Sequence, residues 1–506
     1  MTLEIIKKNW AIIILAILVV WGACLRLYNL GDQSLWMDES YSAIAIERIA
    51  ETGLPQLESD HYYWRGITHN YPTALFQLIF GKSTAVLRLP ASLFGIGTIL
   101  LTYLAGLTFF KKKSIALIAA ALVTFGVFDI GWSRQIRMYT ELQFFFLLSV
   151  TAFYKYFIEK KPTLKKGLIV ILLTLLTVET HLQGMFLFAA YGAMLWLNKD
   201  KISAKTKQVI LFSALGAVFL SLLLDFGSIL RIISGILSDF HFYLPNYLTF
   251  LGKFHTVVLA MGLVGMVMAF RKKNREALLI GVIFGLTLLI LGSSYRIAMR
   301  YLFFAIPFLY LIAAYGMDTL TSIKKYRYLS SLIIFALLAL SFQNSFTLNP
   351  KSEYFLEHDP LSNGPKLDYT PQPDFKKAYQ FIEKNKKSGD LMLVAHTAIH
   401  KWYLPDSDFY WLGFNFGLDP SLPDHATIEQ GDYFVDVYTG TGIVDDLEIL
   451  QELMETNHGY IIWDYFAIDS RLSQPIIEHI RVNAELVYNH QADPELAWTG
   501  IWIYKF

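Results

Sequence analysis

The chain has 506 residues, of which 54% are hydrophobic and 17% charged, and its mean hydropathy is +0.41. A soluble protein carries about a quarter charged residues, so this composition excludes an ordinary soluble protein and favours a polytopic membrane protein. Residues 351–506 hold 25 acidic and 11 basic side chains, whereas residues 1–350 hold 17 acidic and 32 basic. The sequence therefore predicts a basic membrane part followed by an acidic, water-soluble part.

Apolar runs long enough to cross a bilayer recur through the first part of the chain, about eleven in all. The run at 168–197 is interpreted as two short helices that meet at His181, because one helix would place the Lys-rich stretch 199–207 outside. The expected spans are 10–30, 84–110, 114–132, 141–158, 167–180, 181–197, 207–224, 251–270, 276–292, 301–319 and 328–345.

Lysine-rich connections follow alternate spans, which predicts a multi-pass protein of the cell (cytoplasmic) membrane with a cytoplasmic N-terminus. We expect a membrane domain at 1–345, with a long outer loop at 31–83, and a linker at 346–373. Strands alternating with helices predict an α/β domain at 374–506, with some parallel pairing. An odd number of spans makes this domain extracytoplasmic.

Two adjacent carboxylates, Asp38 and Glu39, follow the first span. Apolar residues then recur at helical spacing through 39–51, which predicts an amphipathic helix suited to the membrane surface. Asp38 at its start is a good N-cap, and Glu39 suits the first turn. A capped carboxylate is also a positioned one, so capping and function are compatible. A second surface-lying or re-entrant segment is expected at 222–250.

Arginines on the outer connections break the charge rule that the other loops obey. Arg134 and Arg137 precede Tyr139 and Glu141, and an anionic ligand or a pairing with acidic residues such as Glu141 or Asp38 would explain them. Arg88 and the pair Arg300-Tyr301 repeat the anomaly, with headgroup snorkelling as the alternative explanation. Each position is either a phosphate contact or structural.

Histidines add two further candidates. His69 ends the first outer loop, and His181 lies at the expected helix break; an interface role is the alternative for both. No His, Cys and Asp set has zinc spacing, and no Asp-x-Asp pair lies in the outer loops. No metal is implied, and a divalent cation is the one cofactor left open.

Several motifs follow one another in a fixed order over about residues 20–315. They are WMDE at 36–39, a His…Pro element at 69–72, RLPASLFG at 88–95, SRQIRMYTE at 133–141 and RYLFFAIP at 300–307. This ordered set resembles the GT-C fold membrane glycosyltransferases of the protein O-mannosyltransferase-like branch, which includes the aminoarabinose transferases that modify lipid A. Relatives often have His or Lys directly before a Pro-Pro pair, whereas this chain has His69-Asn70-Tyr71-Pro72.

The resemblance implies transfer of a sugar from a polyprenyl-phosphate carrier to a protein, lipid or glycan acceptor outside the cytoplasmic membrane. It implies that Asp38 is the catalytic base and that Glu39 helps to hold the acceptor or to shape the site. Glu141 is the second residue expected to be catalytic, at a family position often occupied by Asp, and Arg300-Tyr301 match an element near the lipid phosphate. The partners expected are the lipid-linked donor, the acceptor and membrane lipids, and no nucleic acid.

Two other functions compete with this hypothesis. A flippase or transporter of lipid-linked sugars would favour broken helices and polar residues near the middle of the membrane, for which Glu179 and His181 are candidates. A receptor or assembly protein would place its active part in the C-terminal domain, which shows no recognisable ligand motif.

Overall fold

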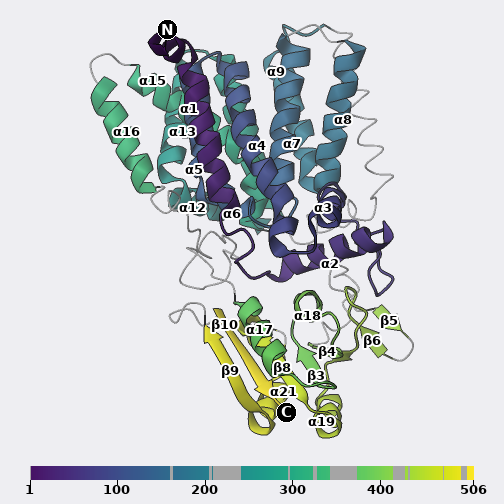
Figure 1. Cartoon of the computed structure of the whole chain (residues 1–506). Coiled ribbons are helices and arrows are strands. Elements are labelled where there is room, and N and C mark those ends of the chain that lie inside the picture. The colour runs from purple at the N-terminus through teal and green to yellow at the C-terminus, as the bar shows by residue number, and fades with distance from the viewer. Residues whose placement is uncertain are drawn as a thin grey trace. The chain divides into compact units, whose positions relative to one another are not determined.

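The computed structural model describes residues 2–159, 163–203, 208, 241–294, 297–322, 327–341, 373–413, 428–430, 433–470, 472–491 and 499–506. They divide into two compact units (Figure 1). The helical unit lies within Met1–Tyr28, Gly66–His69 and Ala91–Tyr369. The α/β unit lies within Asn29–Arg65, Asn70–Pro90 and Thr370–Phe506.

Long apolar helices lie side by side in the helical unit (Figure 1). Two helices, α3 (Ile67–Phe80) and α4 (Thr84–Phe110), run through both units. The other elements are α1 (Thr2–Leu27), α5 (Lys113–Phe125), α6 (Val127–Trp132), α7 (Tyr139–Phe153), η1 (Tyr154–Glu159), α8 (Leu164–Thr180), η2 (Leu182–Met185), α9 (Phe186–Leu197), β1 (His241–Phe242), α12 (Leu244–Phe254), α13 (Thr256–Arg271), α14 (Arg275–Gly292), β2 (Ser293–Ser294), η3 (Met299–Ala305), α15 (Ile306–Thr321) and α16 (Arg327–Ser341).

Four helices in the described part of the chain are long and apolar enough to cross a membrane: Asn9–Leu27, Thr84–Phe110, Arg275–Gly292 and Met299–Thr321. A fifth candidate is a pair of helices within 244–271, bent by 111° at its break. Other expected spans are shorter helices, and the span at 207–224 lies outside the described residues apart from residue 208. The count of about eleven spans stays a prediction.

Small residues set a close helix contact in this unit, between α13 and α15. A Cβ added to Gly265 would lie 2.2 Å from the carbonyl oxygen of Ile312, and one added to Gly316 would lie 2.2 Å from that of Met261. Both distances are far below van der Waals contact, so the two backbones meet directly. Helices in membranes commonly associate in this way, because no hydrophobic force drives apolar helices together in lipid.

The helix break predicted at His181 is confirmed. Helix α8 ends at Thr180, and η2 begins at Leu182 before α9 continues the chain. The Nδ1 atom of His181 accepts a hydrogen bond from the backbone N–H of Gln183 at 3.2 Å. His181 therefore caps the short helix that follows the break.

The α/β unit contains a six-stranded sheet in the order β7-β4-β3-β8-β10-β9. Strands β7, β4, β3 and β8 are parallel, whereas β8, β10 and β9 are antiparallel, so the predicted α/β pattern with some parallel pairing is present. The elements are α2 (Met37–Thr52), α17 (Phe375–Asn385), β3 (Leu391–Val394), α18 (Thr397–Tyr403), β4 (Phe409–Leu412), β5 (Ile428–Gln430), β6 (Tyr433–Val435), β7 (Ile443–Val444), α19 (Leu447–Thr456), β8 (Gly459–Asp464), α20 (Tyr465–Ser470), α21 (Gln474–Asn483), β9 (Glu485–Gln491) and β10 (Gly500–Lys505).

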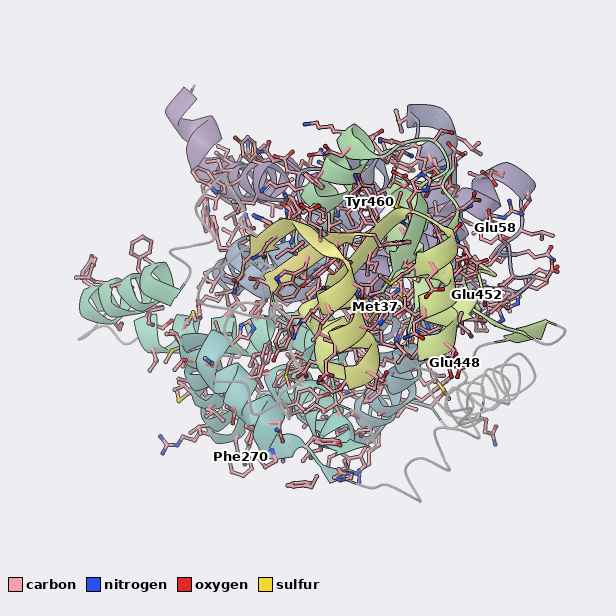
Figure 2. The ribbon with its side chains drawn as sticks, turned by 90° about the horizontal axis from the view of Figure 1, so that it is seen from below. Met37, Glu58, Phe270, Glu448, Glu452 and Tyr460 are labelled. Carbon is pink, nitrogen blue, oxygen red and sulfur yellow. The ribbon has the colours of Figure 1, made fainter. Side chains whose placement is uncertain are left out.

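Helices cover both faces of this sheet. Leu391 and Leu393 of β3 belong to a core that α19 and α21 close, whereas Met392 and Val394 belong to a core that α17 and α18 close. The alternation follows the two-residue period of a strand, and it explains why β3 is a continuous apolar run. The outer surface of α19 is acidic, with Glu448 and Glu452 following one another along the helix (Figure 2).

The amphipathic helix predicted in the first loop is present as α2, but its apolar residues are covered by protein. Ala43 and Ile46 are 0% exposed, and Ile44 and Ala45 pack in a cluster with Ala398 of α18. The expected membrane-lying face is therefore buried, because α2 packs against the C-terminal part of the chain. Of the second such segment, residues 222–240 lie outside the described residues, as does the linker at 346–372.

Candidate functional site

Asp38 lies in the first turn of α2. The helix begins at Met37, and its N-cap is Trp36, with the backbone N–H of Ser40 donating to the Trp36 carbonyl at 3.0 Å. The expectation that Asp38 is the N-cap is wrong, because the helix begins at Met37, two residues before the start that this expectation implies. Asp38 is half-buried, and the dipole of α2 favours a negative charge at this position.

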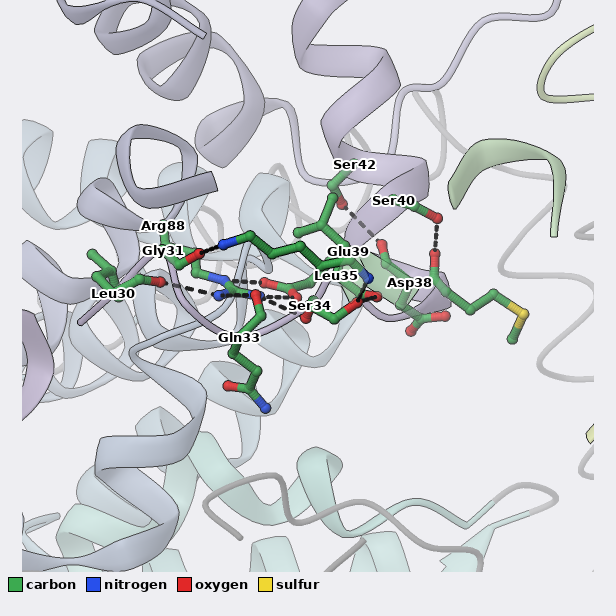
Figure 3. A network of polar contacts seen from close by, with 12 residues as sticks. Leu30, Gly31, Gln33, Ser34, Leu35, Asp38, Glu39, Ser40, Ser42 and Arg88 are labelled. Atoms are coloured by element: carbon green, nitrogen blue, oxygen red, sulfur yellow. Dashed lines mark hydrogen bonds and ion pairs between the residues drawn. The ribbon is translucent and has the colours of Figure 1, made fainter. Parts of the chain in front are cut away.

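Glu39 forms a bidentate ion pair with Arg88 (Figure 3). The Nε and Nη2 atoms of Arg88 donate to the two carboxylate oxygens at 2.9 and 2.7 Å. Both side chains are buried, at 1% and 0% exposed. The other three N–H groups of Arg88 donate at 3.0–3.1 Å to the carbonyl oxygens of Leu30, Gln33 and Ser34.

All five N–H groups of Arg88 are therefore bonded to oxygen atoms of the protein, the full capacity of a guanidinium group. Three of those oxygens belong to the loop that leads into α2, and the other two belong to the residue after Asp38. Arg88 thus fixes the loop and the start of α2 together.

Arg134 caps the C-terminus of α1. Its Nη1 atom donates to the carbonyl oxygens of Leu25, Arg26 and Tyr28 at 3.2, 3.0 and 2.8 Å. These carbonyls lie at the negative end of the helix dipole, where a cation is favoured. The charge of Arg134, which is anomalous for a connection predicted to be outer, therefore has a structural explanation that was not predicted from the sequence.

Five of the candidates from sequence converge within the helical unit, and we name them the arginine–aromatic cluster: Arg137, Tyr139, His181, Arg300 and Tyr301. The guanidinium carbons of Arg137 and Arg300 lie 5.8 and 5.9 Å from the ring centroid of Tyr139. The ring of His181 lies 5.5 Å from that of Tyr139 and 6.2 Å from that of Tyr301.

The arginine–aromatic cluster draws on three segments that are far apart in the sequence. Tyr139 is 3% exposed, so its two guanidinium neighbours lie in surroundings where charge is poorly screened. Two guanidinium groups, with two phenols and an imidazole as additional donors, are well suited to a multivalent anion such as a phosphate.

His69 and Glu141 form a buried pair. The Nδ1 atom of His69 lies 2.7 Å from Oε1 of Glu141, and the two side chains are 1% and 0% exposed. Glu141 therefore pairs with a histidine and not with one of the neighbouring arginines. One residue before His69, the hydroxyl of Thr68 donates to that of Thr180 at 2.9 Å, which joins α3 to the helix break.

The sequence analysis missed a polar cluster in the interior of the helical unit. Oδ2 of Asp129 accepts a hydrogen bond from the Tyr310 hydroxyl at 2.7 Å, and Oδ1 accepts one from Nε2 of Gln143 at 3.1 Å. Arg26 is fully buried and donates to backbone carbonyls at the end of α5. The available signal was a carboxylate and an arginine within expected spans, since ionisable groups there are costly unless paired.

Metal ligands do not gather in the described part of the chain. No three His, Cys, Asp or Glu side chains among those residues lie close enough together to hold an ion. The divalent cation left open by the sequence therefore has no ready ligand set among the described residues.

Comparisons of the sequence with known proteins give little information. No family model matches the chain. A protein of Aquifex aeolicus (strain VF5), described as uncharacterized, is 26% identical over 161 residues, which is 31% of this chain and 31% of that protein. This partial match identifies no activity.

Solved structures are similar over nearly the whole chain. Apo ArnT from Cupriavidus metallidurans has a TM-score of 0.58 and 13% identity, covering 99% of this chain and 98% of that one. The same protein bound to undecaprenyl phosphate has a TM-score of 0.53 at 13% identity, with 98% of each chain covered. Archaeal oligosaccharyltransferase AglB from Archaeoglobus fulgidus has a TM-score of 0.55 at 13% identity, covering 92% of this chain and 70% of that one. The GT-C fold predicted from the ordered motifs is confirmed.

Proposed function

We propose that this chain, which has the GT-C fold, is a membrane glycosyltransferase that moves a sugar from a polyprenyl-phosphate carrier to an acceptor hydroxyl or phosphate. The observation that carries the proposal is the arginine–aromatic cluster, where two guanidinium groups approach one tyrosine ring at 5.8 and 5.9 Å. The neighbours support it, because ArnT was solved with undecaprenyl phosphate and AglB with dolichol-phosphate and an inhibitory peptide.

The proposed reaction is a single displacement. An acceptor oxygen attacks the anomeric carbon of the sugar, the bond between that carbon and the carrier phosphate breaks, and the phosphate leaves with the electron pair. Asp38 takes the proton of the acceptor hydroxyl as general base. One displacement inverts the anomeric configuration. No strong general acid is needed, because a phosphate is already a good leaving group.

The residues of the arginine–aromatic cluster have two kinds of role in this proposal. Arg137 and Arg300 hold the phosphate and stabilise the charge that develops on it as the bond breaks. Tyr139, His181 and Tyr301 supply further donors and aromatic faces around it.

Glu141 orients the ring of His69. We propose that this buried pair shapes the site and fixes the direction of the second ring nitrogen of His69. Arg88 and Glu39 form an ion pair with each other, and we propose that this pair positions Asp38. Arg134 holds the end of α1. The sequence had suggested a site role for all five, with a structural or interface role as the alternative for Arg88, Arg134 and His69.

The location belongs to the proposal as well. Nucleotide sugars are cytoplasmic, whereas a lipid carrier can bring its sugar across the bilayer. We therefore place the reaction on the extracytoplasmic face of the cytoplasmic membrane, with a cytoplasmic N-terminus and an extracytoplasmic C-terminal domain. The acceptor is a protein, lipid or glycan on that face.

The proposal is tested with the purified full chain in lipid nanodiscs. A panel of polyprenyl-phosphate hexoses and pentoses is incubated with cell-envelope protein, lipid and glycan fractions, and mass spectrometry follows both donor and acceptor. Consumption of one donor with a matching mass increase on one acceptor class supports the proposal. Absence of transfer from every donor, with the protein folded and the carrier phosphate bound, contradicts it.

A flippase of lipid-linked sugars is the second candidate, favoured by the helix break at His181 and by the bent pair within 244–271. Broken helices of this kind line the substrate paths of transporters. In sealed proteoliposomes a flippase moves a labelled carrier between leaflets without breaking the sugar–phosphate bond. A transferase leaves the free carrier phosphate behind.

A further inference from the structure

We propose that the C-terminal α/β domain positions the catalytic loop through the hydroxyl of Tyr403. This inference rests on the proposed function, in which Asp38 is the base. The Tyr403 hydroxyl, at the end of α18, accepts a hydrogen bond from the backbone N–H of Leu35 at 3.1 Å. Only Trp36 and Met37 separate Leu35 from Asp38, so the bond acts close to the carboxylate.

A second contact from the same domain reaches the same loop. At the start of α17, the backbone N–H of Lys376 donates to the Ser34 hydroxyl at 3.3 Å, and its Nζ donates to the Gly31 carbonyl at 3.1 Å. Arg88 binds the carbonyls of this loop from α4. The segment 30–35 is therefore held by Arg88 of α4 and by the α/β domain.

The same domain also holds α2 along its length. The ring of Tyr41 stacks on that of Tyr438, with centroids 3.9 Å apart and planes at 19°. Further along the loop, the hydroxyl of Ser59 donates to the carbonyl of Val437. Ala398 of α18 packs between apolar residues of α2 in a shared buried cluster. The contacts are both apolar and polar, and they extend over more than twenty residues of the loop, from 35 to 59.

The topology of the sheet explains why this edge holds the loop. The chain passes from β3 to β4 on one side and later returns to β8 on the other side of β3, so the strand order reverses at β3. Ligands of α/β sheets bind beyond the carboxyl ends of the strands at such a point. Here α18 follows the carboxyl end of β3, and α2 packs against α18.

Tyr403 suits this role because its hydroxyl stays neutral. Burial raises the pKa of Tyr403, while the N–H of Leu35 opposes the rise. A neutral hydroxyl keeps an oxygen lone pair for the backbone N–H without placing a charge beside Arg88 and Glu39. The hydroxyl therefore holds the loop without disturbing the ion pair.

The test compares two tyrosines whose rings stack on each other, Tyr403 and Tyr379, with centroids 5.4 Å apart. Tyr403→Phe removes the acceptor of the Leu35 N–H and keeps the stacked ring. Tyr379→Phe removes a buried hydroxyl for which no loop contact exists among the described residues. We expect Tyr403→Phe to lower kcat by about five- to tenfold, the effect of one hydrogen bond, with an unchanged KM for the donor. Tyr379→Phe should match the wild type in both.

Hydrogen exchange of the full chain in nanodiscs gives a readout that needs no activity. The Ser40 amide, which donates to Trp36 in the first turn of α2, should exchange at least about threefold faster in Tyr403→Phe and at the wild-type rate in Tyr379→Phe. Unchanged exchange and unchanged kcat in Tyr403→Phe would overturn the positioning role while leaving the transferase proposal intact. If the wild type transfers no sugar, the transferase proposal fails, and the exchange rates alone decide whether the domain holds the loop.

Discussion

At the scale of single residues, similar arginines in the connections predicted to be outer have three different environments. Arg134 binds the carbonyl end of a helix, Arg88 binds a carboxylate and a loop, and Arg300 lies against aromatic rings. The sequence indicates that each charge needs a partner, because the positive-inside rule disfavours it there. It does not identify the partner, since the partners of Arg88 and Arg134 lie 49 to 109 positions away.

The arginine–aromatic cluster leads to a binding prediction. Arg300→Gln should weaken binding of a polyprenyl phosphate by about tenfold or more, because a charge-assisted hydrogen bond contributes roughly 1.5–3 kcal/mol. Arg275→Gln is the matched control, since Arg275 is exposed and pairs with Asp200 at the surface. Equilibrium binding in nanodiscs measures both, and equal affinities for the two variants would contradict a phosphate role for Arg300.

The buried ion pair of the first loop leads to a stability prediction. Arg88→Met leaves the Glu39 carboxylate buried without its partner, which should cost about 3 kcal/mol or more. Arg48→Met in α2, the helix that contains Glu39, breaks a partly exposed pair with Glu51 and should cost less than about 1 kcal/mol. Thermal unfolding in detergent compares them. A similar fall of Tm in both variants would show that Arg88 does not anchor the loop.

At the scale of elements, hydrophobic periodicity predicted the helices and strands that depend on local sequence. The helix within 37–52, the break at His181 and the alternation of strand and helix in the C-terminal part all follow from spacing over fewer than twenty residues. Helix α18 was not predicted, and neither was strand β4. Both are short, and α18 has buried residues on most sides, so it shows no amphipathic period.

The contact between α13 and α15 gives a prediction at this scale. Gly316→Ala places a Cβ against the carbonyl oxygen of Met261, and overpacking of this kind costs about 1–3 kcal/mol. Gly285→Ala in α14 meets no atom within 4 Å and should be neutral or slightly stabilising. The apparent Tm of the detergent-solubilised chain measures both. A Gly316→Ala variant as stable as the wild type would mean that the two helices are further apart.

At the scale of the whole molecule, the domains predicted from composition differ from the two units that residue contacts define in the structure. Charge and hydropathy divide the chain into a membrane domain, a linker at 346–373 and an acidic domain. The α/β unit also includes residues 29–65 and 70–90, which contain most of the loop predicted at 31–83. Tyr403 and Leu35 are 368 positions apart, and no local pattern in either segment indicates their hydrogen bond.

The α/β unit should lose stability in mild acid through His400. Burial lowers the pKa of His400 to about 3, with Lys386 and Lys401 adding to the effect. Below pH 6.5, His400 binds a proton in the unfolded chain but not in the folded state. The free energy of unfolding therefore falls by up to about 1.4 kcal/mol per pH unit. The stability is complete above pH 6.5 and is lost as the pH falls towards 3.

Tm measured between pH 7.5 and 4.5 checks this prediction. His400→Gln should show a shallower fall of Tm with acid than the wild type does. His479→Gln, a change at a partly exposed histidine of α21, should keep the wild-type slope. Equal slopes for all three proteins would mean that His400 is protonated in the folded state.

Sugar transfer by Asp38→Asn tests most directly whether Asp38 is the catalytic base. Asn keeps the size and polarity of the side chain and removes its basicity. The predicted result is a loss of kcat of about a hundredfold or more, with binding of the carrier phosphate unchanged. Asp32→Asn, at an exposed carboxylate of the same loop, should keep full activity. Transfer at the wild-type rate by Asp38→Asn would contradict the account.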